Sequence, residues 1–313
     1  MNNILAAIDI GTYTARLLVA QKSSTTFDTF SPLARKRVYI RLAEGCDRAD
    51  EVIIPPPAFH RTLGALNEFL QCIRFYNAES VLAVATGVVR EALNQVDFIA
   101  TIYQQTRIRV RIISGHNEAR LMGKGVLSAL AIEETTALIF DLGGGSTEFL
   151  SSKGNLKYSI PLGAMVLSKK HFKSDPPTKS EFQSLANFIE KSLTAISRFV
   201  TRGNHLIGTG GTVTTLAAML YNIPLEDINP ERINGLIIKR EQLDSLFCQL
   251  SPLSLDNRAS YPGLDLERAD IVLAGFLFII KILHIFKFTQ FTACLSGVLE
   301  GLLIDHFNGE VNE

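Results

Sequence analysis

Short apolar runs that end in glycine recur along the chain, and amphipathic segments separate them. Residues 6–10 form such a run before Gly11, and a second run at 17–20 follows, which predicts two strands joined by a tight polar turn. Residues 56–76 place apolar side chains at the 3.6-residue spacing of a helix that begins in three consecutive prolines. The same reasoning predicts a strand at 80–87, a helix at 89–105 and a strand at 109–113.

The second half of the chain repeats this alternation. Residues 206–218 predict a strand, a glycine turn and a helix, and residues 291–297 predict another strand that ends in glycine before a terminal helix at 298–303. Strands that alternate with helices indicate an α/β fold, in which ligands bind at the carboxyl ends of strands.

An internal repeat refines the fold prediction. Residues 9–18 and 141–150 share an apolar strand, an aspartate, an apolar residue, a glycine, a hydroxyl residue and a returning apolar strand, and each position differs from its counterpart by 132, as Asp9 and Asp141 do. The 313 residues also suffice for two domains of about 150 residues. We therefore expect two related domains that face each other across a cleft, at 1–124 and 125–313. The terminal helix could still pack back on the first domain.

Composition excludes several classes of protein. Lysine and arginine total 31 and aspartate and glutamate total 31, so no basic excess indicates a nucleic-acid binder. The apolar stretch 271–286 contains Lys281 and His284 and is shorter than a membrane span, so we expect a buried helix and no membrane partner. The start of the chain lacks a signal sequence, and cysteines at 46, 72, 248 and 294 have no metal-site spacing. A cytoplasmic globular protein with reduced thiols is expected.

Three glycine turns are candidate phosphate-binding loops. Glycine lets backbone N–H groups approach an anion, and a following helix adds its positive dipole end. The alternative is that these glycines only turn the chain. The candidate phosphate-binding residues in the three loops are Gly11 and Thr12, then Gly143, Gly144, Gly145 and Ser146, then Gly208, Gly210, Gly211 and Thr212.

Acidic side chains near these loops are candidates for metal binding and catalysis. Asp9 and Asp141 end apolar strands, and Glu148 lies on the strand that returns from Asp141, where carboxylates could bind Mg²⁺ or another divalent cation or could cap turns. Glu118 follows the turn after residues 109–113 and could be a general base or a first-turn glutamate. Arg16 and Arg90 could bind phosphate oxygens or be surface charges. No serine-hydrolase elbow or Walker loop is present.

Taken together, these motifs resemble one known family. Its motifs are matched in order by Ile8 to Arg16, Ala85 to Asn94, Ile113 to Leu121, Asp141 to Glu148, Gly208 to Thr215 and Arg268 to Gly275. The set resembles the exopolyphosphatase and guanosine pentaphosphate phosphohydrolase (Ppx/GppA) family. The resemblance implies two ribonuclease-H-like domains of the actin, sugar kinase and heat-shock chaperone superfamily, with a phosphate site in the cleft.

The resemblance also implies a function. It matches Glu118 to the catalytic glutamate, Asp141 and Glu148 to acids needed for metal and water, residues 143–146 to a phosphate loop, and Arg16 and Arg90 to phosphate contacts. The implied activity is Mg²⁺-assisted release of terminal phosphate from inorganic polyphosphate, from guanosine pentaphosphate, or from both.

Three departures from the family pattern leave alternatives open. Asn117 replaces the first of two adjacent glutamates, Tyr13 lies in the first loop, and Leu299 replaces an arginine of the terminal motif. A binding protein that senses guanosine tetraphosphate or polyphosphate is therefore one alternative, and a kinase or ATPase of the superfamily is another. The apolar residues 276–286 could serve the core or a homodimer.

Overall fold

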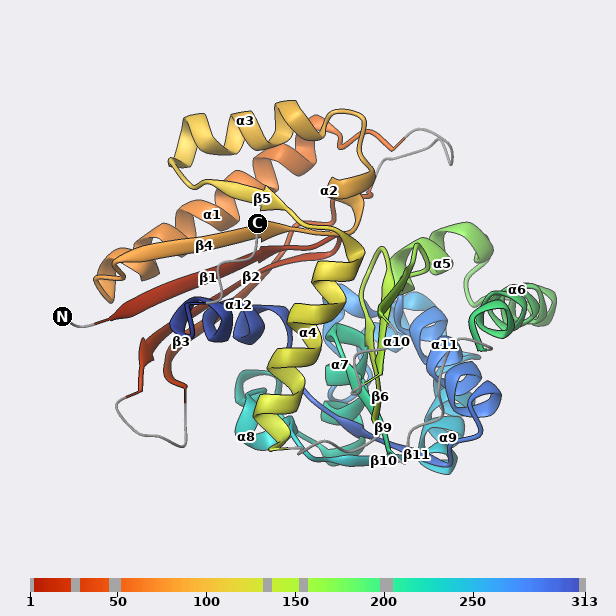
Figure 1. Cartoon of the computed structure of the whole chain (residues 1–313). Coiled ribbons are helices and arrows are strands. Elements are labelled where there is room, and N and C mark those ends of the chain that lie inside the picture. Colours follow the sequence, from red (N-terminus) through yellow and green to blue (C-terminus); the bar gives the residue numbers. More distant parts are fainter. Residues whose placement is uncertain are drawn as a thin grey trace. The chain divides into compact units, whose positions relative to one another are not determined.

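The computed structural model describes residues 3–23, 29–44, 52–131, 137–151, 157–197 and 205–309. The chain divides into two compact units, of which unit 1 comprises residues 1–125 and 297–313, and unit 2 comprises residues 126–296. Each unit is built on one mixed β-sheet with helices packed against it, so the predicted α/β fold class is confirmed (Figure 1).

Unit 1 contains a five-stranded sheet in the order β3-β2-β1-β4-β5. Strands β1, β2 and β3 pair antiparallel, whereas β4 and β5 run parallel to β1. Every residue of β1 is buried, as expected for a central strand of a sheet that is covered on both faces. The strands are β1 (Ile4–Ile10), β2 (Thr14–Lys22), β3 (Phe30–Tyr39), β4 (Ser80–Ala85) and β5 (Val110–Ile112).

The helices of unit 1 cover both faces of this sheet. Phe69 of α1 and Phe98 of α3 join the core that also contains Ile8 and Leu17, while α12 packs on the opposite face against β1 and β2 (Figure 1). The helices are α1 (Pro56–Phe75), α2 (Val88–Glu91), α3 (Gln95–Thr106), α12 (Val298–Phe307) and the part of α4 (Gly115–Leu130) up to Gly125.

The single helix predicted at 89–105 is wrong, because the structure forms α2 and α3 with a break between them. At the break Ala92 is extended, and the Asn94 amide makes two hydrogen bonds with the main chain of Ile54, at 3.0 and 2.9 Å. The Leu93 N–H donates to the Val52 carbonyl at 2.9 Å, so the main chain at Leu93 is bonded to a distant segment and not to the preceding helical turn. Helical spacing alone does not reveal these bonds.

Ion pairs attach the terminal helix to unit 1. Asp305 of α12 binds Arg120 and Lys124 of α4, with nitrogen to oxygen distances of 2.7 and 2.6 Å. Burial alone would raise the pKa of Asp305, but hydrogen bonds from these two cations outweigh burial and lower it. Glu300 of α12 binds Arg35 of β3 at 2.6 Å. These contacts explain why residues 297–313 group with the first unit.

Unit 2 contains a six-stranded sheet in the order β10-β11-β9-β6-β7-β8. The strands β6, β7 and β8 pair antiparallel, and β9 and β11 run parallel to β6, as β4 and β5 do beside β1 in unit 1. The two sheets therefore share one plan, to which unit 2 adds β10. The strands are β6 (Ala137–Leu142), β7 (Thr147–Ser151), β8 (Lys157–Ile160), β9 (His205–Thr209), β10 (Ile237–Lys239) and β11 (Gln290–Ala293).

The helices of unit 2 surround this sheet, and ten of the fourteen residues of α11 are buried. None of the helices in the described part of the chain is both long and apolar enough to cross a membrane. The helices are α5 (Ala164–His171), α6 (Lys179–Ser197), α7 (Gly211–Tyr221), α8 (Pro230–Ile233), α9 (Arg240–Leu250), α10 (Leu255–Ala259), α11 (Val272–Ile285), and the short η1 (Leu225–Asp227) and η2 (Leu266–Arg268). Within the described ranges Cys72, Cys248 and Cys294 form no disulfide bond, and Cys46 lies outside those ranges.

Candidate active site

The first two candidate loops have the same turn geometry. The Gly11 N–H donates to the Thr14 carbonyl at 3.0 Å, and the Gly143 N–H donates to the Ser146 carbonyl at 3.1 Å. A Cβ on either glycine would lie 3.2 Å from that carbonyl oxygen, closer than side chains normally approach. The internal repeat in the sequence therefore corresponds to the same hydrogen bond in both turns, from the glycine N–H to the carbonyl three residues later.

The first N–H groups of helix α5 donate hydrogen bonds to carbonyl groups of the second loop. The Gly143 carbonyl accepts the Ala164 N–H at 2.9 Å, and the Gly144 carbonyl accepts the Met165 N–H at 3.0 Å. In a trans peptide the N–H points opposite to the carbonyl, so the N–H groups of Gly144 and Gly145 point away from α5. Backbone N–H groups oriented in this way suit an anion.

Gly163 was missed by the sequence reasoning. Its backbone lies against the peptide between Gly144 and Gly145, and any side chain at 163 would overlap that peptide. The signal that could have found it is a glycine between a short strand, β8, and the first residue of α5. Gly163 therefore belongs to the packing of the second candidate loop.

The segment after β3 supports the first loop in the same manner. The Leu42 N–H donates to the Thr12 carbonyl at 2.8 Å, and the Ile40 N–H donates to the Tyr13 carbonyl at 3.0 Å. The Thr12 hydroxyl oxygen accepts the Val88 N–H at 3.0 Å, which joins this loop to the turn that carries Arg90. A hydroxyl that accepts one bond still has its own hydrogen to donate.

Two of the departures from the family pattern are packed side chains. The ring of Tyr13 is buried, lies 5.6 Å from the ring of Tyr39, and has the Arg41 guanidinium 4.9 Å from its centre. Leu299 is buried in α12. Both residues therefore contribute to the packing of unit 1.

Asp9 and Arg16 form an ion pair in unit 1. They face each other in the register of β1 and β2, and the Arg16 Nε lies 3.1 Å from the Asp9 carboxylate, which is 1% exposed. The Thr86 hydroxyl lies at hydrogen-bonding distance from the other carboxylate oxygen, at 3.5 Å. Asp9 thus faces a guanidinium, not a second carboxylate.

Asp141 and Glu148 occupy the equivalent positions in unit 2. They face each other in the register of β6 and β7 and are 7% and 2% exposed. The Ser159 hydroxyl donates to Glu148 at 2.8 Å, and the Asp141 carboxylate lies against Gly210. Two carboxylates on one face of a strand pair offer the oxygen ligands that a divalent cation prefers, so this pair fits such an ion. No cluster of three or more metal-binding side chains is found among the residues that the structure describes.

Glu118 and Arg90 are brought together from different elements. Glu118 lies in the first turn of α4 and is 7% exposed, and the Arg90 Nη1 is 2.8 Å from its carboxylate. The same nitrogen lies 3.1 Å from the Ile113 carbonyl, which fixes the guanidinium between the end of β5 and α4. Arg90 also contacts the exposed Glu91 at 3.5 Å.

The glycines of the third loop have two different roles: Gly208 packs inside a strand, and Gly210 precedes a helix. Gly208 lies inside β9 against the rings of Phe140 and Phe291, so packing accounts for this glycine. Gly210 has a φ of +94°, which favours glycine, and it precedes the first residue of α7. Its neighbours are also close packed, since Gly211 lies against the Arg268 guanidinium and Thr212 lies against Gly275.

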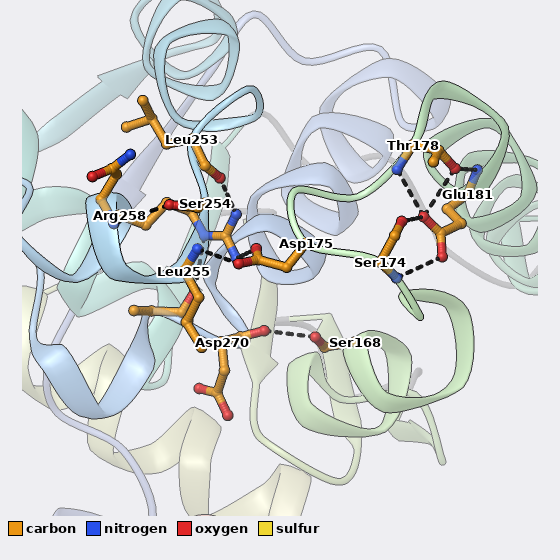
Figure 2. Close-up of polar contacts among 12 residues, drawn as sticks. Ser168, Ser174, Asp175, Thr178, Glu181, Leu253, Ser254, Leu255, Arg258 and Asp270 are labelled. Carbon is orange, nitrogen blue, oxygen red and sulfur yellow. Dashed lines mark hydrogen bonds and ion pairs between the residues drawn. The ribbon is translucent and has the colours of Figure 1, made fainter.

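Arg268 was not assigned as a site residue from the sequence, although it lies in a motif that carried the resemblance. The segment that contains it is held by polar contacts, several of which Figure 2 shows. Arg258 donates to the Ala269 carbonyl at 3.2 Å and to Asp175 at 3.1 Å, and the Ser168 hydroxyl of α5 donates to the Asp270 carbonyl at 2.6 Å. Burial lowers the pKa of Arg258, and Asp175 opposes that change. These contacts connect the supports of the second and third loops.

Two sheets of one plan, each with a glycine turn after a strand that carries a buried aspartate, define a two-unit α/β protein. The chain belongs to the Ppx/GppA phosphatase family, whose family model matches residues 18–310. It is 27% identical to Exopolyphosphatase 2 of Mycobacterium tuberculosis over 96% of this chain and 97% of that protein. It is 28% identical to a bifunctional 3-dehydroquinate synthase/phosphatase of Fusobacterium nucleatum, over 91% of this chain, and spans only 44% of that longer protein.

Solved structures agree with this assignment. The Aquifex aeolicus member of the Ppx/GppA family has a TM-score of 0.80 and 28% identity, with 99% of each chain covered. An exopolyphosphatase from Cytophaga hutchinsonii has a TM-score of 0.86 and 27% identity, with 98% of each chain covered. The fold and family expected from the sequence are therefore confirmed.

Proposed function

We propose that this protein hydrolyses terminal phosphoanhydride bonds, releasing phosphate from inorganic polyphosphate and, as a second substrate with the same terminal group, from guanosine pentaphosphate. The family match and the exopolyphosphatase relatives of nearly equal length support a hydrolase of this type. Both substrates end in the same phosphoanhydride, so one set of loops would serve both. A cytoplasmic location and a homodimer remain predictions from the sequence.

The pair formed by Glu118 and Arg90 carries the proposal. A buried carboxylate fixed by a guanidinium at 2.8 Å is positioned to accept the proton of an attacking water. Arg90 is also proposed to donate to phosphate oxygens, on which negative charge accumulates during phosphoryl transfer. The N–H groups of Gly144 and Gly145, which point away from α5, supply further donors of the kind that stabilise such charge.

Asp141 and Glu148 are the residues that would hold a divalent cation, with Mg²⁺ as the expected ion. Such an ion, when bound, polarises phosphate oxygens and lowers the pKa of a bound water. Asp9 was a third candidate ligand, and its ion pair with Arg16 makes it the weakest of the three. Arg16, which binds Asp9 through two nitrogens, is kept in the proposal as a phosphate contact, because a guanidinium pairs well with phosphate oxygens.

The test compares two glutamates that contact the same arginine. Glu118→Gln should abolish phosphate release from both substrates, while Glu91→Gln, which removes an exposed carboxylate from Arg90, should keep nearly full activity. Phosphate release and circular dichroism would be measured for both variants with polyphosphate and guanosine pentaphosphate side by side. Undiminished release by a folded Glu118→Gln protein would exclude Glu118 as the base, and no release by the wild type would exclude the proposed function.

A further inference from the structure

The edge strand of the unit 1 sheet concentrates positive charge on one face. Between residues 98 and 113 the sequence contains arginines at 107, 109 and 111 and no acidic residue. The three arginines are exposed, and the intervening Ile108 and Val110 are buried. Because side chains alternate along a strand, Arg109 and Arg111 point to one side of β5 at a step of roughly 7 Å, and Arg107 precedes them at the left-handed end of α3. We call Arg107, Arg109 and Arg111 the arginine row.

An aromatic ring organises the outer part of the arginine row. The guanidinium carbons of Arg107 and Arg109 lie 5.8 and 5.9 Å from the centre of the Tyr103 ring on α3. The Arg107 N–H donates to the Tyr103 carbonyl at 2.9 Å, which fixes the backbone between helix and strand. The electron-rich ring attracts both cations and offsets part of their mutual repulsion. Two like charges are therefore held close together on the same ring.

The inner end of the arginine row leads to the candidate base. Arg111 is in register with Val84, and Val84 is in register with Asp9, so the row meets the strand ends of the site. The chain continues to Ile113, whose carbonyl binds the same Arg90 nitrogen that binds Glu118. From residue 109 to residue 113 an extended chain covers about 13 Å. The row is thus a linear set of cations directed along β5 toward Glu118.

We propose that the arginine row binds the distal part of a polyphosphate chain whose terminal phosphate is at Glu118, a proposal that rests on the proposed function. Inorganic polyphosphate is a linear anion with charge at every unit, and a row of guanidiniums complements it. A single-stranded nucleic acid is the other linear polyanion to consider, and it binds largely by stacking bases on aromatic rings. Tyr103 is 38% exposed and already contacts two guanidiniums, and Phe98 is buried, so this face lacks a stacking platform.

The kinetic test depends on the length of the substrate. Tripolyphosphate is too short to span from Glu118 to Arg109, whereas a chain of several hundred phosphates spans the whole row. In the double variant Arg107→Gln with Arg109→Gln, the KM for the long chain should rise about tenfold with kcat unchanged, and the KM for tripolyphosphate should stay within twofold. The slope of log KM against log salt concentration for the long chain should fall by roughly one to two. Arg111 is left intact because it shares a register row with Asp9.

Two control variants are needed. The first tests whether the positive charges or the arginine side chains themselves matter, and the second tests whether removing any two exposed cations has the same effect. Arg107→Lys with Arg109→Lys should keep most of the long-chain affinity, since the positive charges remain. Arg74→Gln with Lys191→Gln removes two exposed cations elsewhere and should change neither KM. An unchanged KM for the long chain in the Gln double variant would overturn the proposal. So would equal changes for both substrates, or competition by single-stranded DNA that depends on Arg107 and Arg109.

Binding distinguishes failure of this proposal from failure of the proposed function. In the Glu118→Gln background, which should not hydrolyse substrate, titration with long-chain polyphosphate measures affinity directly. Adding Arg107→Gln and Arg109→Gln should weaken that affinity about tenfold. If the wild type releases no phosphate, yet this difference in affinity is found, the arginine row stands as a polyphosphate site and only the hydrolytic function falls. If the difference is absent, the row is not such a site, whatever the activity of the wild type.

Discussion

The hairpins β1–β2 and β6–β7 share one backbone and carry different charges. Both turns close with a glycine N–H to the carbonyl three residues on, and in both the segment after the third strand supports the turn. At the same register position unit 1 pairs Asp9 with Arg16, whereas unit 2 pairs Asp141 with Glu148. Like charges directly opposite on a strand pair are destabilising unless a cation lies between or beside them. The two hairpins therefore differ in charge at one equivalent position, and the proposed cation site belongs to the second of them.

The largest effect is expected when the second hairpin is given the charges of the first. Glu148→Arg places an arginine opposite Asp141, a pairing that the shared register already accommodates in unit 1. We expect phosphate release to fall by at least about a thousandfold, because a cation at this position supplies several kcal/mol of charge stabilisation and every 1.36 kcal/mol is tenfold in rate. Phosphate-release kinetics measure the loss, with circular dichroism as the check on folding. Activity within tenfold of the wild type would mean that the two hairpins do not differ in function.

A smaller effect is expected on stability in the presence of metal. A cation that binds only the folded protein at one hundred times its Kd stabilises it by ~2.7 kcal/mol, which raises the melting temperature of a unit of this size by about 5–10 °C. We expect Mg²⁺ to raise the melting temperature of the wild type and not that of Asp141→Asn. Asp9→Asn is the matched variant in unit 1 and should keep the rise. Loss of the rise in Asp9→Asn would instead make Asp9 a metal ligand, as the sequence first suggested.

The comparison also shows which features a sequence can predict. The repeat of apolar strand, aspartate and glycine located both hairpins, because a buried strand and a tight turn leave a local pattern. The sequence also held Arg16 and Glu148 at equivalent positions. The strand register shows that each of them faces an aspartate, so only the structure shows that Arg16 forms a pair of opposite charges and Glu148 a pair of like charges.

Features that depend on distant contacts could not be predicted. Asn94 ends a helical pattern because it binds Ile54, forty residues earlier. Gly208 follows the pattern of a phosphate loop, yet it is small because two rings from neighbouring strands pack on it. Arg268 lies against Gly211, far from it in the sequence. In each case the partner is set by tertiary packing, which has no local signature.

The smallest expected effect is a change of melting temperature with pH. It concerns the segments that hydrogen-bond to the backs of the first and second loops. The support of the first loop includes hydrogen bonds from Arg61 to the carbonyls of Ile40 and Arg41. The support of the second loop, α5, continues into residues 173–178, where Glu181 accepts hydrogen bonds from backbone and hydroxyl groups (Figure 2). A hydrogen bond from the Ser174 hydroxyl, followed by those from the N–H groups of Thr178 and Lys173, lowers the pKa of Glu181 to about 2.

A lowered pKa in the folded state means that Glu181 stabilises the protein above its usual value of 4.5 and that this stabilisation is lost as the pH falls toward 2. The melting temperature of the wild type should therefore exceed that of Glu181→Gln at pH 6, and the difference should vanish near pH 2. Ser174→Ala removes the main hydrogen bond to the carboxylate, so in that background the difference should be smaller and should vanish at a higher pH. Thermal melts of the four proteins between pH 2 and 6 measure this. A difference that does not change with pH would show that Glu181 acts through packing and that the two supports do not differ in their response to protons.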